Sequence, residues 1–373
     1  MRIALFCHSL LSDWNHGNAH FLRGVVTELA SRGVRVDVYE PRDAWSVRNL
    51  VADRGAGALE AARRAYPGLK PIRTDSSFDV ARATSRADVV VVHEWNDPAL
   101  VRALGDLRKR GAPFRLLFHD THHRSVTAPH EIARYDLSGY DGVLAFGAVV
   151  RDLYLRNGWA RRAWTWHEAA DARVFHPVAA VKDYDLVWVG NWGDGERTAE
   201  LHEFLLDPVR DLGLRALVHG VRYPPSALAA LHDAGIEHGG WLPNFEVPRL
   251  FARARVTVHV PRRPYAGVLP GIPTIRPFEA LACGIPLICA PWVDAERLFR
   301  PGRDYLVARD GVEMRGHLRA VLDDAALRHA LSSSGRETIL ARHTCAHRAD
   351  ELLRICAELG IRFESGDDRR ASA

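Results

Sequence analysis

Short runs of consecutive apolar residues alternate with helix-like segments along most of this 373-residue chain. In the first half the strand-length runs lie at 2–7, 34–39, 88–94, 114–120 and 142–147. Helix-like stretches lie between and after them, at 18–32, 44–65, 97–110 and 148–157. The runs are continuous in Val, Leu and Ile, which is typical of parallel strands buried on both faces of a sheet. This series predicts an open, doubly wound α/β sheet.

The alternation is interrupted near 167–183, where a proline and mixed polarity replace the periodic pattern. A second series then begins, with strand-length runs at 184–190, 214–220, 255–260, 286–291 and 304–308. Helices are expected near 198–211, 225–234, 246–253, 277–283 and 311–342. Because 373 residues exceed the size at which one hydrophobic core keeps growing, we predict two doubly wound domains, 1–178 and 179–345.

Composition narrows the class of protein. The five cysteines include no Cys-x-x-Cys pair, which argues against a disulfide framework or a zinc ribbon and favours a reducing cytoplasm. The formal charge of +4 is small and the charged residues are interspersed, so no nucleic-acid partner is expected. No apolar run reaches the roughly 18–20 residues of a membrane span. The apolar start of the chain is expected to form a buried strand and not a signal peptide.

Ligands of open α/β sheets bind beyond the carboxyl ends of the strands, and with two facing sheets we expect the active site in the cleft between the domains. The segment 269–291 joins such a strand end to a helix, with Pro277 expected at the first helical position. The free N–H groups around 274–279 would form an anion site, and Arg276 adds a charge suited to phosphate. Glu279 could accept hydrogen bonds from two vicinal hydroxyls at the same opening, or merely complement the helix dipole. A phosphate beside a diol describes the diphosphate and ribose of a nucleotide.

The same segment carries a family resemblance. "PGIPTIRPFEALACGIPLICAPW", continued by "LFRPGRDYLVARD", resembles the donor-binding segment of group 1 glycosyltransferases with the GT-B fold, in particular their spore-maturation-protein (CgeB-like) branch. The supporting pieces are "VWVGNWGDGER", "VHGVRYP", "HGGWLPNFEVPRLFARARVTVHV" and "ARHTCAHRADELL". The resemblance covers residues 184–353 and is weaker in the first half, where it rests on 16–40 and 118–123.

The resemblance implies two facing Rossmann-like domains, with the acceptor bound by 1–178 and the nucleotide-sugar donor by 179–345. The helix 346–361 is expected to pack back on the first domain. It also implies that Glu279 holds the donor ribose. The turn that receives the diphosphate would be formed by Thr274, Ile275 and Arg276.

Other donor contacts follow from the same comparison. Trp241 and Leu242 stand where the resemblance places the nucleobase pocket, and Asn191 and Arg197 follow the first strand of the second half. The position eight residues before Glu279, a second glutamate in many retaining members of the family, is Gly271 here. Members of the family usually carry an Arg…Lys pair after the first strand of the second domain. In this chain Arg197 matches the arginine, but no lysine follows it. Both retaining and inverting chemistry therefore stay open.

Candidate residues in the first half follow its strands. Gly17 and Asn18 open a helix and could approach the donor phosphate or the acceptor, although a plain strand–helix turn would look the same. His16 and Asp13 lie in the same loop and are possible proton acceptors. After another strand, Glu94 is a further possible base, next to Trp95, which could stack on a sugar or simply belong to the core.

The densest polar cluster is "FHDTHHRS", which contains His119, Asp120, His122 and His123. Zinc or iron could be held by such residues, but an Asp–His pair that takes the proton of an acceptor hydroxyl is the preferred interpretation. Asp120 is the first choice of base. In the second half, Arg262 and Arg263 could reach a phosphate or form a solvated pair.

These observations predict a glycosyltransferase that moves a sugar from a nucleotide-diphosphate sugar to an unidentified acceptor, with no cofactor and no divalent metal. The sequence Asp183–Tyr184–Asp185 matches a metal-binding motif of another glycosyltransferase fold, but it precedes a strand and is interpreted as chance. Two alternatives are a nucleotide-sugar epimerase of the same fold and a non-catalytic nucleotide-sugar-binding protein.

Overall fold

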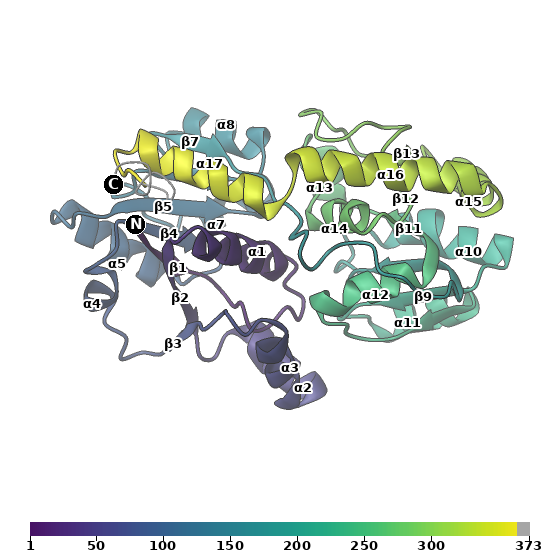
Figure 1. Cartoon of the computed structure of the whole chain (residues 1–373), viewed down its shortest axis with the longest axis horizontal. Helices are drawn as coiled ribbons and strands as arrows, with labels where there is room; N and C mark the ends of the chain where they lie inside the picture. The colour runs from purple at the N-terminus through teal and green to yellow at the C-terminus, as the bar shows by residue number, and fades with distance from the viewer. Residues whose placement is uncertain (364–373) are drawn as a thin grey trace, which may run out of the picture. The chain divides into compact units, whose positions relative to one another are not determined.

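The computed structural model describes residues 1–363 and divides into two compact units (Figure 1). The first unit contains residues 1–168 together with the C-terminal segment from Cys345, and the second unit is Ala169–Thr344. In the described residues, no helix is both long and apolar enough to cross a membrane.

The described part of the first unit contains a seven-stranded sheet in the order β3-β2-β1-β4-β5-β6-β7, in which every neighbouring pair is parallel. Its strands are β1 (Arg2–Phe6), β2 (Arg35–Pro41), β3 (Ile72–Thr74), β4 (Val89–His93), β5 (Arg115–Asp120), β6 (Gly142–Ala145) and β7 (Ala163–Thr165). The order reverses between β1 and β4, and ligands of such sheets bind beyond the carboxyl ends of the strands at this point.

Helices cover this sheet and connect its strands. They are α1 (Asn18–Ser31), α2 (Trp45–Arg54), α3 (Gly57–Ala65), α4 (Val80–Thr84), α5 (Pro98–Lys109), α6 (Arg124–Thr127), α7 (Pro129–Ile132), α8 (Ala148–Arg156) and α17 (Cys345–Glu358). The last of these packs along α1, and the indole Nε1 of Trp166 donates a hydrogen bond of 2.9 Å to the carbonyl of Arg348. The chain's last helix thus completes its first unit.

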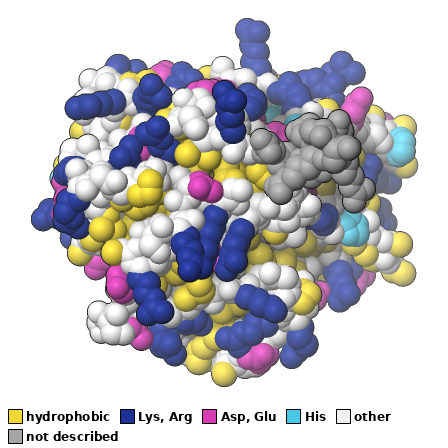
Figure 2. Space-filling model, turned by 60° about the vertical axis from the view of Figure 1, so that its left-hand side comes forward, with side chains coloured by type: hydrophobic (Ala, Val, Ile, Leu, Met, Phe, Trp, Pro, Cys, Tyr) yellow, Lys and Arg dark blue, Asp and Glu magenta, His cyan; other side chains and the backbone are white. Residues whose placement is uncertain are grey.

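The surface of the molecule carries many basic side chains on the face that Figure 2 turns forward. Lys and Arg are numerous there and Asp and Glu are fewer, while hydrophobic atoms appear in small patches (Figure 2). At strand starts of the first unit several arginines are paired: Arg2 contacts Asp37 at 2.5 Å, and Arg115 contacts Asp141 at 3.2 Å. The charges of these two arginines are therefore compensated by neighbouring carboxylates.

The second unit holds a six-stranded parallel sheet, counted over the described residues, in the order β10-β9-β8-β11-β12-β13. Its strands are β8 (Tyr184–Val189), β9 (Ala216–His219), β10 (Ile236–His238), β11 (Ala254–His259), β12 (Leu287–Cys289) and β13 (Leu306–Val307). The order reverses between β8 and β11. The two parallel α/β sheets confirm the predicted fold class.

The connecting segments of the second unit are mostly helical. They are α9 (Thr198–Leu201), the π-helix η1 (His202–Leu206), α10 (Asp207–Leu212), α11 (Pro225–Asp233), the 3-10 helix η2 (Asn244–Glu246), α12 (Val247–Ala252), α13 (Arg263–Gly267), α14 (Ile275–Cys283), α15 (Gly311–Asp323) and α16 (Ala325–Arg342). Successive residues of β8 face opposite cores: Leu186 and Trp188 pack in one cluster, and Val187 and Val189 in the other. Burial on both faces explains why the strand is apolar throughout.

Several predicted boundaries need correction. The predicted helix 44–65 is two helices, because Gly55 leaves the helical conformation at φ 75°. The predicted helix 311–342 is also two, since the side chain of Asp324 caps a new helix by accepting from the N–H groups of Ala326 and Leu327. Pro277 is not the first helical residue, because α14 already begins at Ile275.

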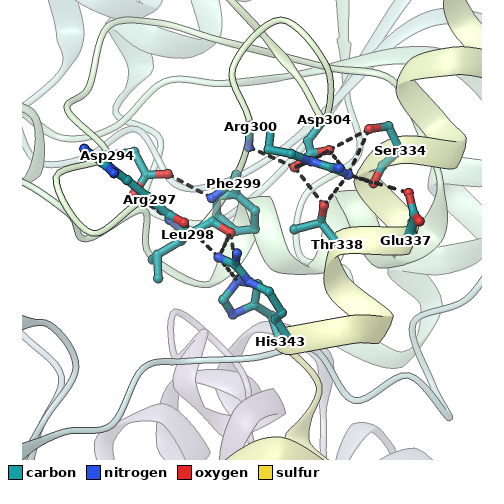
Figure 3. A network of polar contacts seen from close by, with 11 residues as sticks. Asp294, Arg297, Leu298, Phe299, Arg300, Asp304, Ser334, Glu337, Thr338 and His343 are labelled. Carbon is teal, nitrogen blue, oxygen red and sulfur yellow. Dashed lines mark hydrogen bonds and ion pairs between the residues drawn. The ribbon is translucent and has the colours of Figure 1, made fainter.

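A buried polar network fixes the loop between β12 and β13 to α16 (Figure 3). Asp304 is fully buried, and its carboxylate accepts hydrogen bonds from Ser334 Oγ at 2.7 Å and from Thr338 Oγ1 at 2.9 Å. Arg300 reaches the same carboxylate through Nε at 3.1 Å and also donates to Thr338. In the same loop, Asp294 accepts the backbone N–H of Phe299 at 2.9 Å. A fully satisfied network of this kind rigidifies the loop beside the α14 segment.

Candidate functional site

The start of α14 has an unusual backbone. Thr274, its N-cap residue, lies at φ 62° and ψ −179°, which a β-branched residue adopts only at a cost of order 1–3 kcal/mol. The hydroxyl of Thr274 accepts no hydrogen bond from the N–H groups of the first helical turn, although threonine commonly does so at an N-cap position. A helix start with its N–H groups directed outward favours an anion. The strain and the missing cap together make this turn a candidate binding element.

Three arginines lie close together near the carboxyl ends of β8 and β11: Arg197, Arg262 and Arg276. Arg197 donates to the carbonyl of Val260 at 2.7 Å and to the carbonyl of Asn191 at 2.7 Å. The amide oxygen of Asn191 accepts from Arg197 at 3.1 Å and from Arg262 at 3.1 Å, so two guanidinium groups meet at one neutral oxygen. Arg262 also donates to Glu196 at 2.8 Å.

The electrostatics of this cluster confirm that its cations lie close together. Burial lowers the pKa of Arg197 to about 9, and the neighbouring charges of Arg262 and Arg276 act in the same direction. His259, the last residue of β11, has its pKa lowered to about 3 by burial and then by Arg197 and Arg276. His259 was missed from the sequence, where it looks like part of an apolar strand. The cluster is a region of concentrated positive charge.

Glu279 lies one turn into α14 and pairs with Arg276. Its side chain is fully buried, whereas that of Arg276 keeps 16% of its surface exposed. The expectation that Glu279 faces an opening is therefore wrong for this conformation, because the carboxylate is covered and one of its oxygens contacts the guanidinium. Ile275, the first helical residue, is also buried.

Other predicted donor residues lie at separate points of the second unit. Trp241 and Leu242 are half-buried, and Leu242 packs against the apolar cluster that contains Phe278. Gly271 has φ 92°, and a Cβ there would come within 2.9 Å of Glu296 Cγ. A side chain at 271 is thus excluded by backbone conformation and by Glu296 together.

The motif at Asp183–Tyr184–Asp185 is structural. Asp183 pairs with Arg253, whose Nε lies 3.1 Å from each carboxylate oxygen. Asp185 accepts the backbone N–H of Arg215 at 3.0 Å. Both carboxylates lie at the start of β8, opposite the carboxyl end of that strand.

In the first unit, Asp13 and Asp120 do not fit the role of an accessible base. Asp13 forms a buried ion pair with Arg23 at 2.9 Å, and Arg23 in turn donates to the carbonyl of Leu10 at 2.6 Å. Asp120 is fully buried and accepts from Tyr154 Oη at 2.8 Å and from the N–H of His122 at 3.1 Å. Burial, then the neighbouring Glu94, raises the pKa of Asp120 to about 8. The first choice of base is therefore enclosed, and it keeps its proton at neutral pH.

Four histidines form a buried row along the carboxyl ends of the strands. The ring centroids lie 5.3 Å apart for His8 and His16, 6.2 Å for His16 and His93, and 5.2 Å for His93 and His119. His119 is fully buried against Phe21 and Trp166, so it cannot contact a substrate. Within the described residues neither of its ring nitrogens has a hydrogen-bond partner.

Burial holds every histidine of the row neutral. It lowers the pKa of His119 to about 3 and that of His8 to about 4. The pKa values of His16 and His93 are also lowered well below 6.5 by burial, and nearby imidazoles add to the effect. His16 is oriented by a hydrogen bond with the backbone of Ser9, and its Nε2 has no partner in the described part of the chain. A neutral imidazole with one unengaged nitrogen is suited to accept a proton.

The helix start beside His16 supplies polar groups. Gly17 is the N-cap of α1, with φ −61° and no side-chain cap. The amide nitrogen of Asn18 donates to Glu168 at 2.9 Å, and its amide oxygen is buried with no partner among residues 1–363. Asn18 therefore has an unused acceptor near His16.

The remaining polar cluster is held together internally. Glu94 is fully buried, accepts from the N–H of Thr121 at 3.0 Å and pairs with Arg124. The guanidinium of Arg124 lies 4.1 Å from the ring centroid of Trp95. His122 and His123 have ring centroids 4.0 Å apart, and the Nδ1 of His123 lies 2.7 Å from the hydroxyl of Thr127. Over residues 1–363, no group of three or more His, Cys, Asp and Glu residues is arranged to hold a metal ion.

Comparisons with known proteins agree with this architecture. Residues 197–354 match the model of the family described as glycosyl transferase-like, and no curated protein matches the chain. The protein HepE of Anabaena, in complex with UDP-glucose, is similar in structure with a TM-score of 0.68 and 13% identity over 96% of this chain and 100% of that one. Sucrose-phosphate synthase from Thermosynechococcus elongatus has a TM-score of 0.65 and 15% identity over 96% of this chain and 99% of that one.

A third similar structure is an α-glucosyltransferase in complex with UDP and DNA, with a TM-score of 0.64 and 12% identity over 96% of this chain and 99% of that one. At such low identities the three structures establish the fold. The family match adds the sequence pattern of the second unit, and it extends into α17. The chain therefore has the two-sheet GT-B fold of these structures, and its residues 197–354 match a glycosyl transferase-like family model.

Proposed function

We propose that this protein transfers a sugar from a nucleotide-diphosphate sugar to an acceptor hydroxyl. The observation that carries the proposal is the convergence of Arg197, Arg262 and Arg276 at the carboxyl end of the second sheet, beside the uncapped start of α14. The carboxylates that pair with these arginines are Glu196 and Glu279. Such an excess of positive charge suits the diphosphate that leaves during sugar transfer.

The positive charge at this site supports the binding of a diphosphate without a metal ion. A helix start carries about half a positive charge, and an arginine keeps its full charge at neutral pH. The amide oxygen of Asn191, which now accepts from two guanidinium groups, marks a point where an anionic oxygen could be bound in its place. We therefore propose that these groups, and not a divalent cation, stabilise the leaving group.

A uridine diphosphate sugar is the donor to test first, because similar structures were obtained with UDP or UDP-glucose. We propose that the nucleobase lies against Trp241 and Leu242 and that the ribose reaches Glu279. For this contact Arg276 has to leave Glu279 and turn to the diphosphate, since the carboxylate is covered in the structure. On donor binding, Arg276 would thus pair with the diphosphate and Glu279 with the ribose hydroxyls, in place of their ion pair with each other.

In the first unit we propose that His16 is the catalytic base and that the reaction inverts the anomeric centre. The acceptor hydroxyl gives its proton to Nε2 of His16 while its oxygen forms a bond to the anomeric carbon. The bond from that carbon to the diphosphate breaks, and its electron pair leaves with the diphosphate. His16 replaces Asp120 in this role: both residues are buried, but Nε2 of His16 has no partner in the described part of the chain, whereas both carboxylate oxygens of Asp120 accept hydrogen bonds.

The alternatives are less well supported. The family match favours sugar transfer over epimerisation of a nucleotide sugar. A reducing cytoplasmic setting fits the five cysteines, all of which are buried. The decisive experiment is incubation with UDP-glucose and related donors, with free UDP and the sugar product measured separately. Released UDP indicates transfer or hydrolysis, an altered nucleotide sugar indicates epimerisation, and binding without either indicates a non-catalytic protein.

A further inference from the structure

Two tryptophans and two histidines form a continuous aromatic cluster at the carboxyl ends of β1 and β2. Trp14 follows β1, and Trp45 is the first residue of α2. Their ring centroids lie 6.2 Å apart at an angle of 78°. His8 lies 4.9 Å from Trp45 and 5.3 Å from His16. We call these four residues the aromatic wall; its tryptophans are half-buried and its histidines buried.

Hydrogen bonds hold the wall in place. The indole Nε1 of Trp14 donates to Asp53 at 3.2 Å, so its polar atom is already used and the ring offers apolar contact. The backbone N–H of Ser46 donates to Nε2 of His8 at 3.3 Å. The hydroxyl of Ser12 donates to the carbonyl of Ser46 at 2.9 Å, which joins the loop after β1 to the start of α2. The rings are therefore fixed by two elements and not by one mobile loop.

One buried hydrogen-bonding atom at the inner end of the wall has no partner among the described residues. Since His16 uses Nδ1 for the backbone of Ser9, Nε2 keeps a lone pair and has no partner among the described residues. Asp13, in the same loop as His16, is paired with Arg23, and the charge that contacts the wall directly is the carboxylate of Asp53 at Trp14. The wall thus combines ring faces with a single neutral acceptor, and it contains no lysine or arginine.

This chemistry indicates the class of the acceptor, and the inference rests on the proposed sugar transfer. A pyranose ring has an apolar face of C–H groups, which packs on an indole, and hydroxyl groups at its edge, one of which can donate to an imidazole nitrogen. A strongly anionic acceptor would meet no compensating charge in the wall. We infer that the acceptor is a neutral carbohydrate whose ring stacks on Trp14 or Trp45 while one hydroxyl reaches Nε2 of His16.

The first experiment observes the wall directly and needs no turnover. The protein is labelled with 5-fluorotryptophan, and the resonances of Trp14 and Trp45 are assigned by their loss in Trp14→Phe and Trp45→Phe. Neutral oligosaccharides such as maltotriose, cellotriose and chitotriose are then added. We expect at least one of the two resonances to shift in a saturable way while that of Trp164, a half-buried tryptophan in β7, stays in place. If neither resonance moves with any neutral sugar, or if both respond only to single-stranded DNA, the inference is overturned.

The second experiment uses turnover with UDP-glucose and the sugar found to bind. Trp45→Ala should raise the KM for the sugar about tenfold, as expected for the loss of one aromatic contact, and leave the affinity for UDP unchanged. Trp45→Phe keeps an aromatic ring at this position, so its KM for the sugar should stay close to that of the wild type. Equal KM values for wild type and both variants would contradict the inference. Failure of UDP to bind would instead count against the proposed function, and the fluorine experiment would still decide on the wall.

Discussion

Arg276 and Glu279 form an ion pair across the first turn of α14, and the carboxylate of this pair is fully buried. A buried carboxylate without its partner is far more costly than the pair itself, because its charge is left uncompensated. The pair therefore links two properties of the second unit. It stabilises the helix start in the structure described here, and it keeps together the two side chains that we assign to the diphosphate and the ribose.

Removing the cation should destabilise the protein. Arg276→Ala leaves Glu279 buried and unpaired, and we expect the free energy of unfolding to fall by about 2–3 kcal/mol, less than for a fully buried pair because Arg276 is partly exposed. The double variant Arg276→Ala/Glu279→Gln should recover part of the loss, since glutamine carries no charge. Urea unfolding of the three proteins measures this. An undiminished midpoint in Arg276→Ala would show that the pair contributes nothing.

Loss of Arg262 should weaken nucleotide binding without affecting the fold. Arg262→Ala removes one of the two guanidinium groups at Asn191, and a charged hydrogen bond of about 1.5–3 kcal/mol corresponds to at least a tenfold weaker Kd for UDP. Arg249→Ala is the matched control, because Arg249 is an exposed arginine of the same unit that pairs with Glu246. Calorimetric titration with UDP compares them. Equal Kd values would remove Arg262 from the donor site.

Catalysis should proceed in the absence of divalent ions. The arginines and the start of α14 supply the positive charge, so the metal-stripped enzyme in excess chelator should retain its release of UDP from UDP-glucose. The measurement is the initial rate with chelator and after adding back magnesium or manganese. Activity that disappears with chelator and returns only with a metal ion would contradict this assignment of the charge.

His16 should control turnover and not donor affinity. His16→Asn should lower kcat by about 10²–10⁴-fold while the Kd for UDP stays unchanged. Because burial lowers the pKa of His16 well below 6.5, the imidazole is already unprotonated at pH 6, and the wild-type rate should show no acid limb between pH 8 and 6. A rate that falls with a midpoint near 6.5 would show that the base is an exposed histidine.

The pH dependence of stability should change when His119 is replaced. Burial lowers the pKa of His119 to about 3, so between pH 6.5 and 3 the unfolded chain binds a proton at this residue that the folded chain does not. The neutral His119 therefore does not lower the free energy of unfolding above pH 6.5. Below pH 6.5 that free energy falls by about 1.4 kcal/mol per pH unit until the pKa of the folded state is reached. His119→Phe should match the wild type at pH 7.5 and exceed it at pH 5. Parallel stability curves in urea at the two pH values would contradict this.

The long strands could be predicted from the sequence. β4 (VVVVH) and β5 (RLLFHD) are built around apolar runs of four and three residues, and such runs indicate buried parallel strands. The strands β3, β7 and β10 were missed, because each has three residues and lies at or next to the edge of its sheet. Whether such a short segment forms a strand depends on the adjacent strand of the sheet with which it pairs, and not on its own amino-acid composition.

The candidate site was harder to predict, because its exposure is set by residues distant in sequence. Asp120 lies at a strand end as expected, but Tyr154 of α8 covers it from 34 positions further along. The pairing of Glu279 with Arg276 follows from their spacing on a helix, whereas the full burial of Glu279 does not. The backbone contact that orients His16 toward Ser9 and leaves its Nε2 without a partner among the described residues does not follow from the sequence.

The return of α17 to the first unit affects the order in which the chain can be completed. The second unit is one continuous stretch, so during synthesis it can fold as soon as Thr344 has left the ribosome. The first unit has to wait, because the backbone carbonyl that binds Trp166 and the helix that packs along α1 belong to α17. Although its first 168 residues are synthesised before the second unit, the N-terminal unit lacks α17 until the end of synthesis. A nascent chain that stops before Cys345 would present the uncovered side of α1 to chaperones and proteases.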